Sequence, residues 1–96
     1  MVVHIVMFKF KENNKEAHIA QAETMLEALE GKVPSLRSME VGINFAQEER
    51  AMDMSIITTF DDKEGLHAYA VDEAHQDVVA FLKEVCEYTK VVDYET

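Results

Sequence analysis

The chain opens on a run of β-branched and aromatic side chains that ends at Lys11. Successive side chains of a strand point to opposite faces of its sheet, so this run divides into two sets. One set is Val2, His4, Val6, Phe8 and Phe10, and the other is Val3, Ile5 and Met7. Because both sets are mainly apolar, we expect a strand over residues 2–11 that is covered on both faces.

A helical pattern follows. Asn13 and Glu16 have the spacing of a capping box, and apolar residues then recur every three or four positions, at Ile19, Ala22, Leu26 and Leu29. This spacing predicts a helix from about 14 to 30. Gly31 suits a left-handed residue after its last turn, and Pro34 prevents any continuation.

The middle of the chain alternates between apolar and polar residues. Residues 36–45 show this period of two, and after a polar turn at 47–50 residues 51–60 show it again. The second segment places four apolar side chains on one face: Met52, Met54, Ile56 and Phe60. The two segments predict an antiparallel hairpin.

The last third returns to helical spacing. Asp61 and Glu64 repeat the capping pattern before a short helix at about 62–70, and residues 74–87 predict a second helix. The chain closes on a predicted strand at 89–95. The order β-α-β-β-α-β, with the second helical crossing broken in two, is that of the split βαβ, ferredoxin-like α+β fold.

The chain has 96 residues, which is enough for one domain spanning 1–96. A domain this small gains burial by association, and the helices of this fold cover only one face of the sheet. Since the first strand is apolar on both faces, we expect a homodimer whose two sheets enclose a cavity.

Charge and motifs exclude several classes of function. Nine basic and nineteen acidic residues give a net charge of −10, which argues against binding to nucleic acid or to a membrane surface. One cysteine, Cys86, and the absence of a C-x-x-C motif fit a reducing cytoplasm, and no signal peptide is recognisable. Nucleotide-binding and metal-binding motifs are absent, so we expect no cofactor and no metal.

Six segments in this order resemble the stress-responsive A/B barrel, or Dabb, family. They are residues 4–11, Val33-Pro34, Gly42-Ile43-Asn44, residues 53–60, residues 66–75 and Val92-Asp93-Tyr94. The resemblance covers nearly the whole chain and implies a dimeric α+β barrel built from two ferredoxin-like protomers. Most members of the family have no assigned chemistry.

One plant member of the family is a polyketide cyclase, and this resemblance implies three catalytic positions: His4, Tyr69 and His75. The chain also departs from that enzyme. Met54 stands where the cyclase has a further histidine, and Asp72-Glu73 replaces the His-Pro that the family usually carries.

Each of the three residues also has a structural interpretation. His4 shares a face with apolar side chains, which favours a neutral imidazole that accepts a proton, or a core histidine that bonds a backbone carbonyl. His75 near a helix start is either a second neutral histidine of the cavity or a capping residue. Tyr69 is either a donor to a developing oxyanion or an aromatic anchor of its helix.

An apolar lining for a small ligand is predicted from two strands. It comprises Val6, Phe8, Met52, Met54 and Ile56, although such a stripe also suits a plain dimer core. The sequence therefore predicts a Dabb-type homodimer that binds a small apolar or aromatic molecule. The alternatives are a cofactor-free lyase or cyclase, a stress-related structural dimer without ligand, and a cofactor-free monooxygenase, which the absence of tryptophan disfavours.

Overall fold

The computed structural model describes residues 1–96 and contains four strands and three helices. In chain order they are β1 (Val2–Phe10), α1 (Lys15–Glu27), β2 (Ser38–Ile43), β3 (Met54–Phe60), α2 (Lys63–Val71), α3 (Glu73–Val85) and β4 (Cys86–Glu95). The predicted element order and the division of the second helical crossing are both confirmed.

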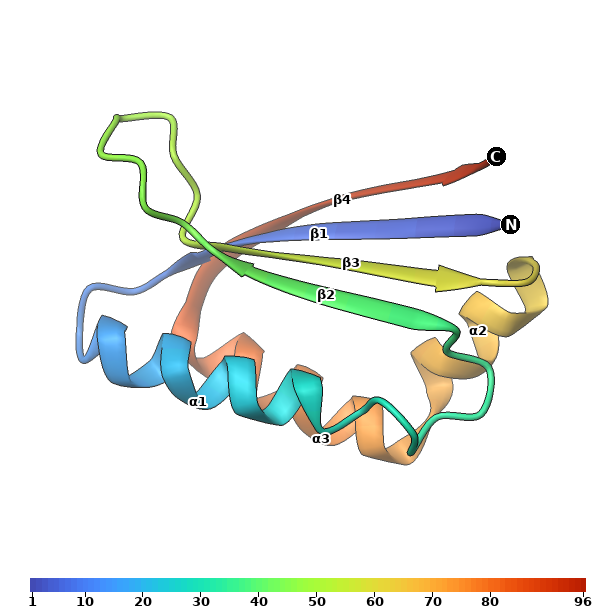
Figure 1. Cartoon of the computed structure of the whole chain (residues 1–96). Coiled ribbons are helices and arrows are strands. Elements are labelled where there is room, and N and C mark those ends of the chain that lie inside the picture. The colour runs from blue at the N-terminus through green and yellow to red at the C-terminus, as the bar shows by residue number, and fades with distance from the viewer.

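The strands form one antiparallel sheet in the order β2-β3-β1-β4, which is the ferredoxin-like α+β arrangement. Figure 1 shows the helices on one side of this sheet, with nothing on its other side. We refer to these as the helix-facing side and the open side. At the centre of the sheet His4 lies opposite Thr58 of β3 and Asp93 of β4.

The core lies between the sheet and the helices. Phe10 and Phe60 are completely buried there, and Met54 and Ile56 are nearly so. On the open side Val3, Ile5 and Ile57 are half-buried only by their neighbours in the sheet, and Met7, Val92 and Tyr94 are exposed. Strand β1 is therefore apolar on both faces, as predicted, but within one chain only one face is covered.

The hairpin is shorter than predicted. Strand β2 ends at Ile43 and strand β3 begins at Met54. The residues between them form a projecting loop, visible at the upper left of Figure 1. The side chain of Asn44 closes a local turn by bonding both the N–H and the carbonyl of Ala46. Phe45, predicted in a strand, is 96% exposed, and Met52 also lies outside β3.

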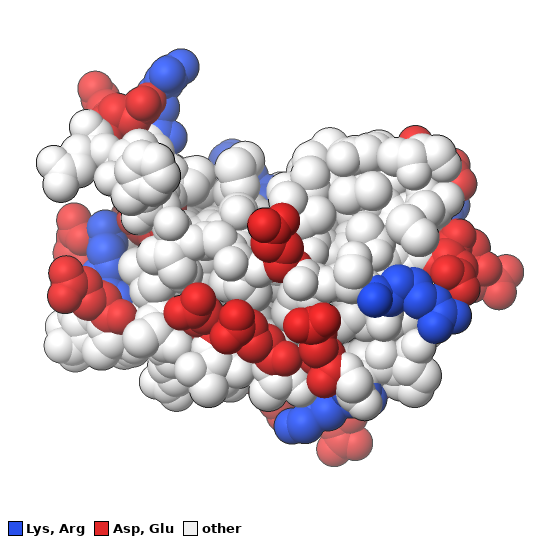
Figure 2. All heavy atoms as spheres, in the orientation of Figure 1, with Lys and Arg blue, Asp and Glu red and all other residues white.

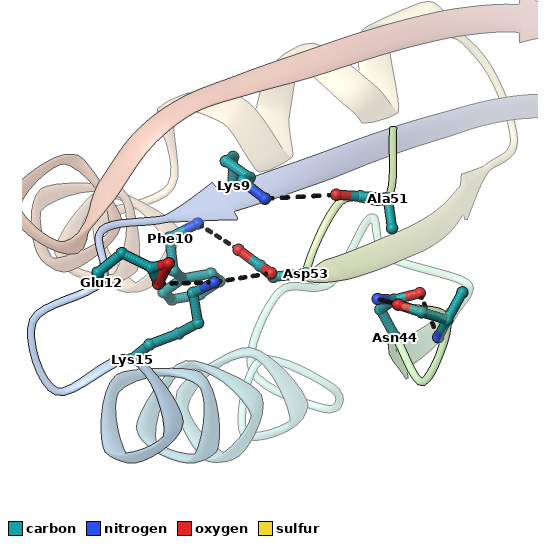
Figure 3. Close-up of polar contacts among 8 residues, drawn as sticks. Lys9, Phe10, Glu12, Lys15, Asn44, Ala51 and Asp53 are labelled. Atoms are coloured by element: carbon teal, nitrogen blue, oxygen red, sulfur yellow. Dashed lines mark hydrogen bonds and ion pairs between the residues drawn. The ribbon is translucent and has the colours of Figure 1, made fainter. Parts of the chain in front are cut away.

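Asp53 explains why β3 begins late. Figure 3 shows its carboxylate turned toward β1, where Oδ2 accepts a 2.7 Å hydrogen bond from the backbone N–H of Phe10 and Oδ1 lies 3.4 Å from the Nζ of Lys15. The register of β1 against β4 shifts between Lys9 and Phe10. A carboxylate that bonds a backbone N–H at this irregularity fixes the chain locally and removes Asp53 from the strand alternation.

The observed ends of the helices also differ in detail from the predicted ones. The capping box at Asn13 does not form: Asn14 is the N-cap of α1, with φ of 56° and no side-chain capping bond. The N-cap of α2 is Asp62, one residue later than predicted, and it accepts a hydrogen bond from Gly65 N–H. Gly31 has the expected positive φ, of 84°, although α1 already ends at Glu27.

His18 is half-buried with its ring edge-on to Phe81, so it belongs to the packing of α1 on α3. No helix has the length and apolar character needed to cross a membrane. Figure 2 shows acidic side chains spread over several parts of the face shown, with fewer basic ones among them.

Candidate functional site

A cavity of about 340 Å³ lies on the helix-facing side, between the sheet and α3. We call it the slot. Its walls are mainly apolar and come from Val6, Phe8, Leu26, Ile56, Val79 and Leu82. Cavities of this size and lining are typical of sites for small molecules. The slot lies within one chain, whereas the sequence predicted a cavity between the sheets of two chains.

His4 contributes the polar group of β1 to the slot. Its side chain is 18% exposed, and its Nδ1 contacts a carboxylate oxygen of Asp93, the residue directly opposite on β4. Because a carboxylate only accepts hydrogen bonds, Nδ1 carries a hydrogen, and Nε2 is the nitrogen on which the neutral ring would accept a proton. The arrangement is that of a carboxylate that orients an imidazole for proton transfer.

Tyr69 of α2 lines the same slot and is almost completely buried. Its ring packs between Phe60, at 5.2 Å between centroids, and His75, at 4.1 Å, and the ring of His4 is 6.4 Å away. Burial raises the pKa of the Tyr69 hydroxyl to about 12. The hydroxyl therefore stays protonated near neutral pH and can donate a hydrogen bond to a molecule in the slot.

His75 lies in the first turn of α3, as the sequence indicated, but it is not among the residues that line the slot. Its Nδ1 donates to the Ala70 carbonyl oxygen at 3.3 Å. Burial, with a smaller effect of nearby His4, lowers the pKa of the His75 imidazole, so the ring is neutral at neutral pH. The turn around it is held by Asp72, whose carboxylate accepts from Ala74 N–H.

The structure places only part of the predicted apolar lining at the slot. Val6, Phe8 and Ile56 line the slot. Met54 and Met52 do not: Met54 lies in the closed core, and together they border a different hollow at the β2–β3 end of the sheet. Met52 is displaced because the chain leaves the strand conformation before Asp53 makes its bonds to β1 and α1.

The sequence did not predict the whole site. Asp93 contacts His4, and Lys83, Cys86 and Glu87 are among the further residues that line the slot. The position of Asp93 could have been found by pairing the first and last strands, because the helix-facing positions of β4 oppose those of β1. Burial raises the pKa of the Cys86 thiol to about 11, which leaves it a weak nucleophile.

No three His, Cys, Asp or Glu side chains converge in the way that a metal ion would require. The polar groups that border the slot include the imidazole of His4 and the phenol of Tyr69, set in a mainly apolar wall. These groups suit removal of a proton from an apolar molecule and stabilisation of the oxyanion that results.

Comparisons with known proteins agree with the fold. A dimeric protein of unknown function with a ferredoxin-like fold from Bacteroides fragilis is 28% identical, with a TM-score of 0.88 over 99% of this chain and 95% of that one. A dimeric ferredoxin-like protein of unknown function from a Jannaschia species is 30% identical, with a TM-score of 0.84 over 99% and 98%. No curated protein matches the chain.

A hydroxynitrile lyase from Passiflora edulis has the same fold, with a TM-score of 0.85 over 97% of this chain and 90% of the lyase. At a sequence identity of 20%, this similarity shows a common fold and nothing more. The model of the family described as the stress responsive A/B barrel domain matches residues 2–96. The chain therefore belongs to the Dabb family.

Proposed function

We propose that the slot binds a small apolar or aromatic molecule and that His4 and Tyr69 act on its oxygen-bearing end, as in a cofactor-free lyase or cyclase. The observation that carries this proposal is the convergence of His4 and Tyr69 on one apolar cavity, with Asp93 on the far nitrogen of His4. A buried histidine needs a hydrogen-bond partner in either case, so it is the cavity bordered by both His4 and Tyr69 that favours a chemical role.

The proposed chemistry begins with a carbon acid next to a carbonyl group. Nε2 of His4 accepts the proton from carbon, and the electron pair moves to the carbonyl oxygen. Tyr69 donates a hydrogen bond from its hydroxyl to the enolate oxygen, and burial, which raises the pKa of this hydroxyl to about 12, keeps it protonated. His75 does not touch the substrate in this scheme, because it lies outside the slot. Its neutral ring packs on the phenol ring of Tyr69 and so positions Tyr69.

We propose further that the active form is a homodimer joined through the open side of the sheet. Val3, Ile5 and Ile57 form an apolar centre on that side, and exposed Val92 and Tyr94 continue it along β4. The two most identical proteins described above are themselves dimeric. Burial of this surface is worth about 25 cal/mol for each Å² of apolar area.

Hydrogen–deuterium exchange tests the chemistry without knowledge of the natural substrate. An apolar methyl ketone in D₂O exchanges its α-hydrogens, and NMR follows the rate. The native protein should accelerate exchange, and His4→Ala should lose most of the acceleration, since a positioned general base contributes roughly 10²–10⁴-fold. Tyr69→Phe should also lower the rate while the ketone still binds.

The matched control is His67→Ala, which removes an exposed histidine of α2 that lies outside the slot. This variant should exchange the ketone at the native rate. Equal rates for the native protein, His4→Ala and free imidazole would contradict the proposed chemistry. In that case a purely structural dimer, in which His4 affects thermal stability alone, would describe the protein better.

A further inference from the structure

The slot has two different ends. At one end are His4 and Tyr69, and at the other are Lys83 and Glu87, all of which border the cavity. Tyr69 is buried, whereas Lys83 and Glu87 are exposed, so we call the charged end the mouth and the tyrosine end the floor. The middle is apolar and is formed by Val6 and Val79, among others.

Strand β1 gives the length of the slot. The lining residues extend along β1 from His4 to Phe8, a span of about 13 Å at the rise of an extended chain. Along α3 they extend from Val79 to Lys83, a span of about 6 Å at the helical rise, so α3 covers only part of that length.

The two ends differ in charge, because the mouth carries both Lys83 and Glu87 whereas the floor carries the carboxylate of Asp93. Lys83 is the only Lys or Arg that borders the slot, and it joins none of the ion pairs of the chain. At the floor, the carboxylate of Asp93 lies against His4 and disfavours a second anion there. An anionic group would therefore be less disfavoured at the mouth, where Lys83 can pair with it, than at the floor, where no lysine or arginine borders the slot.

We infer that the ligand is an elongated amphiphile that carries an anionic group, such as a carboxylate, at Lys83 and a neutral oxygen function at His4 and Tyr69. This inference rests on the proposed function, because it assigns the substrate class of the same slot. The apolar middle then covers a hydrocarbon segment, and the reacting carbon lies at the end remote from the anionic group.

Lys83 also has a structural explanation that the test must separate. It lies in the last turn of α3, where a cation stabilises the helix dipole. That role would change the melting temperature in Lys83→Gln but would not distinguish between ligands. The ratio of the affinities for two ligands that differ only in charge isolates the contribution of Lys83 to binding.

The experiment compares decanoate with 1-decanol by NMR titration of the native protein, Lys83→Gln and Glu87→Gln. In Lys83→Gln the ratio of decanoate affinity to decanol affinity should fall about two- to fivefold, as expected for a solvent-accessible ion pair, with decanol affinity unchanged. In Glu87→Gln the ratio should rise, because a carboxylate beside the mouth is removed.

An unchanged ratio in Lys83→Gln would overturn the inference, whether or not the melting temperature falls. If decanol still binds in the slot, the proposed function is left standing. A ratio that falls in Glu87→Gln would also overturn it. If neither decanoate nor decanol binds to the native protein, the ligand role of the slot fails together with the inference. Exchange catalysis by His4 is measured separately and distinguishes the two failures.

Discussion

His4 and Asp93 are separated by almost the entire sequence, yet they face each other across β1 and β4 with imidazole Nδ1 against a carboxylate oxygen. The contact ties the first strand to the last on the helix-facing side of the sheet. It also leaves Nε2 as the nitrogen of His4 that Asp93 does not hold. The orientation of the proposed base thus depends on the register of the two strands.

Substitution of Asp93 by Asn should disturb this orientation with little loss of stability. An amide can either accept from Nδ1–H or donate to a bare Nδ1, so the single tautomer is no longer imposed. Nitrogen-15 NMR of the imidazole should show a mixture of tautomers, and exchange of the ketone should slow. Because Asp93 is half-exposed, the free energy of unfolding should fall by only about 0.2–1 kcal/mol.

Asp53 should matter for folding rather than for chemistry. Its carboxylate is 12% exposed and bonds the Phe10 N–H and the Lys15 ammonium (Figure 3). Asp53→Ala leaves a buried N–H without a partner, and the free energy of unfolding in urea should fall by about 1–3 kcal/mol. Asp53→Asn keeps an acceptor oxygen and should lose less. Equal losses would show that the bond to Phe10 is unimportant.

The stability of the protein should depend on the protonation of His75. Burial lowers its pKa in the folded state below 6.5, the ordinary value for histidine, so below pH 6.5 the unfolded chain binds more protons than the folded one. The free energy of unfolding should therefore fall as the pH drops below 6.5, until the folded-state pKa is passed. Above pH 6.5 the contribution is fully present.

Urea denaturation between pH 5 and 8 measures this dependence. His75→Gln should flatten the part of the profile below pH 6.5, because the group that titrates differently in the two states is removed. His67→Gln, on an exposed part of α2, is the matched control and should leave the profile unchanged. A native profile retained in His75→Gln would assign the dependence to other groups.

The proposed dimer can be disrupted from the open side of the sheet. Val92, 51% exposed on β4, belongs to that side, whereas Val71, 59% exposed, ends α2. In size-exclusion chromatography with light scattering, the native protein and Val71→Glu should elute as dimers, and Val92→Glu should shift toward monomer. A Val92→Glu protein that stays fully dimeric at micromolar concentration would place the interface elsewhere.

The sequence predicted the element order well because periodicity reports which side of an element is buried. The apolar alternation from Val2 to Phe10 was sufficient to place His4 on a face with Val6 and Phe8. It could not show whether helices or a second sheet would cover that face, because both coverings require the same apolar side chains. For this reason His4, Val6 and Phe8 were assigned to a cavity between two chains, whereas they border a slot within one.

The errors in the hairpin and in the site have a common origin in contacts between distant residues. Asp53 leaves the strand pattern because Phe10 and Lys15 hold it, and neither is near it in sequence. Asp93 reaches His4 only through the pairing of β1 with β4. Local patterns carry no information on such partners, which is why Met52 was assigned to the lining and Asp93 was given no role.

The location of the ligand is the most direct test of this account. Methyl NMR during titration with 1-decanol compares Val6, Val79 and Leu82, which border the slot, with Val3 and Ile57 on the open side of the sheet. Binding in the slot should shift the methyl signals of Val6, Val79 and Leu82 in a saturable way and leave those of Val3 and Ile57 unchanged. Shifts confined to Val3 and Ile57, or no saturable shift at all, would contradict it.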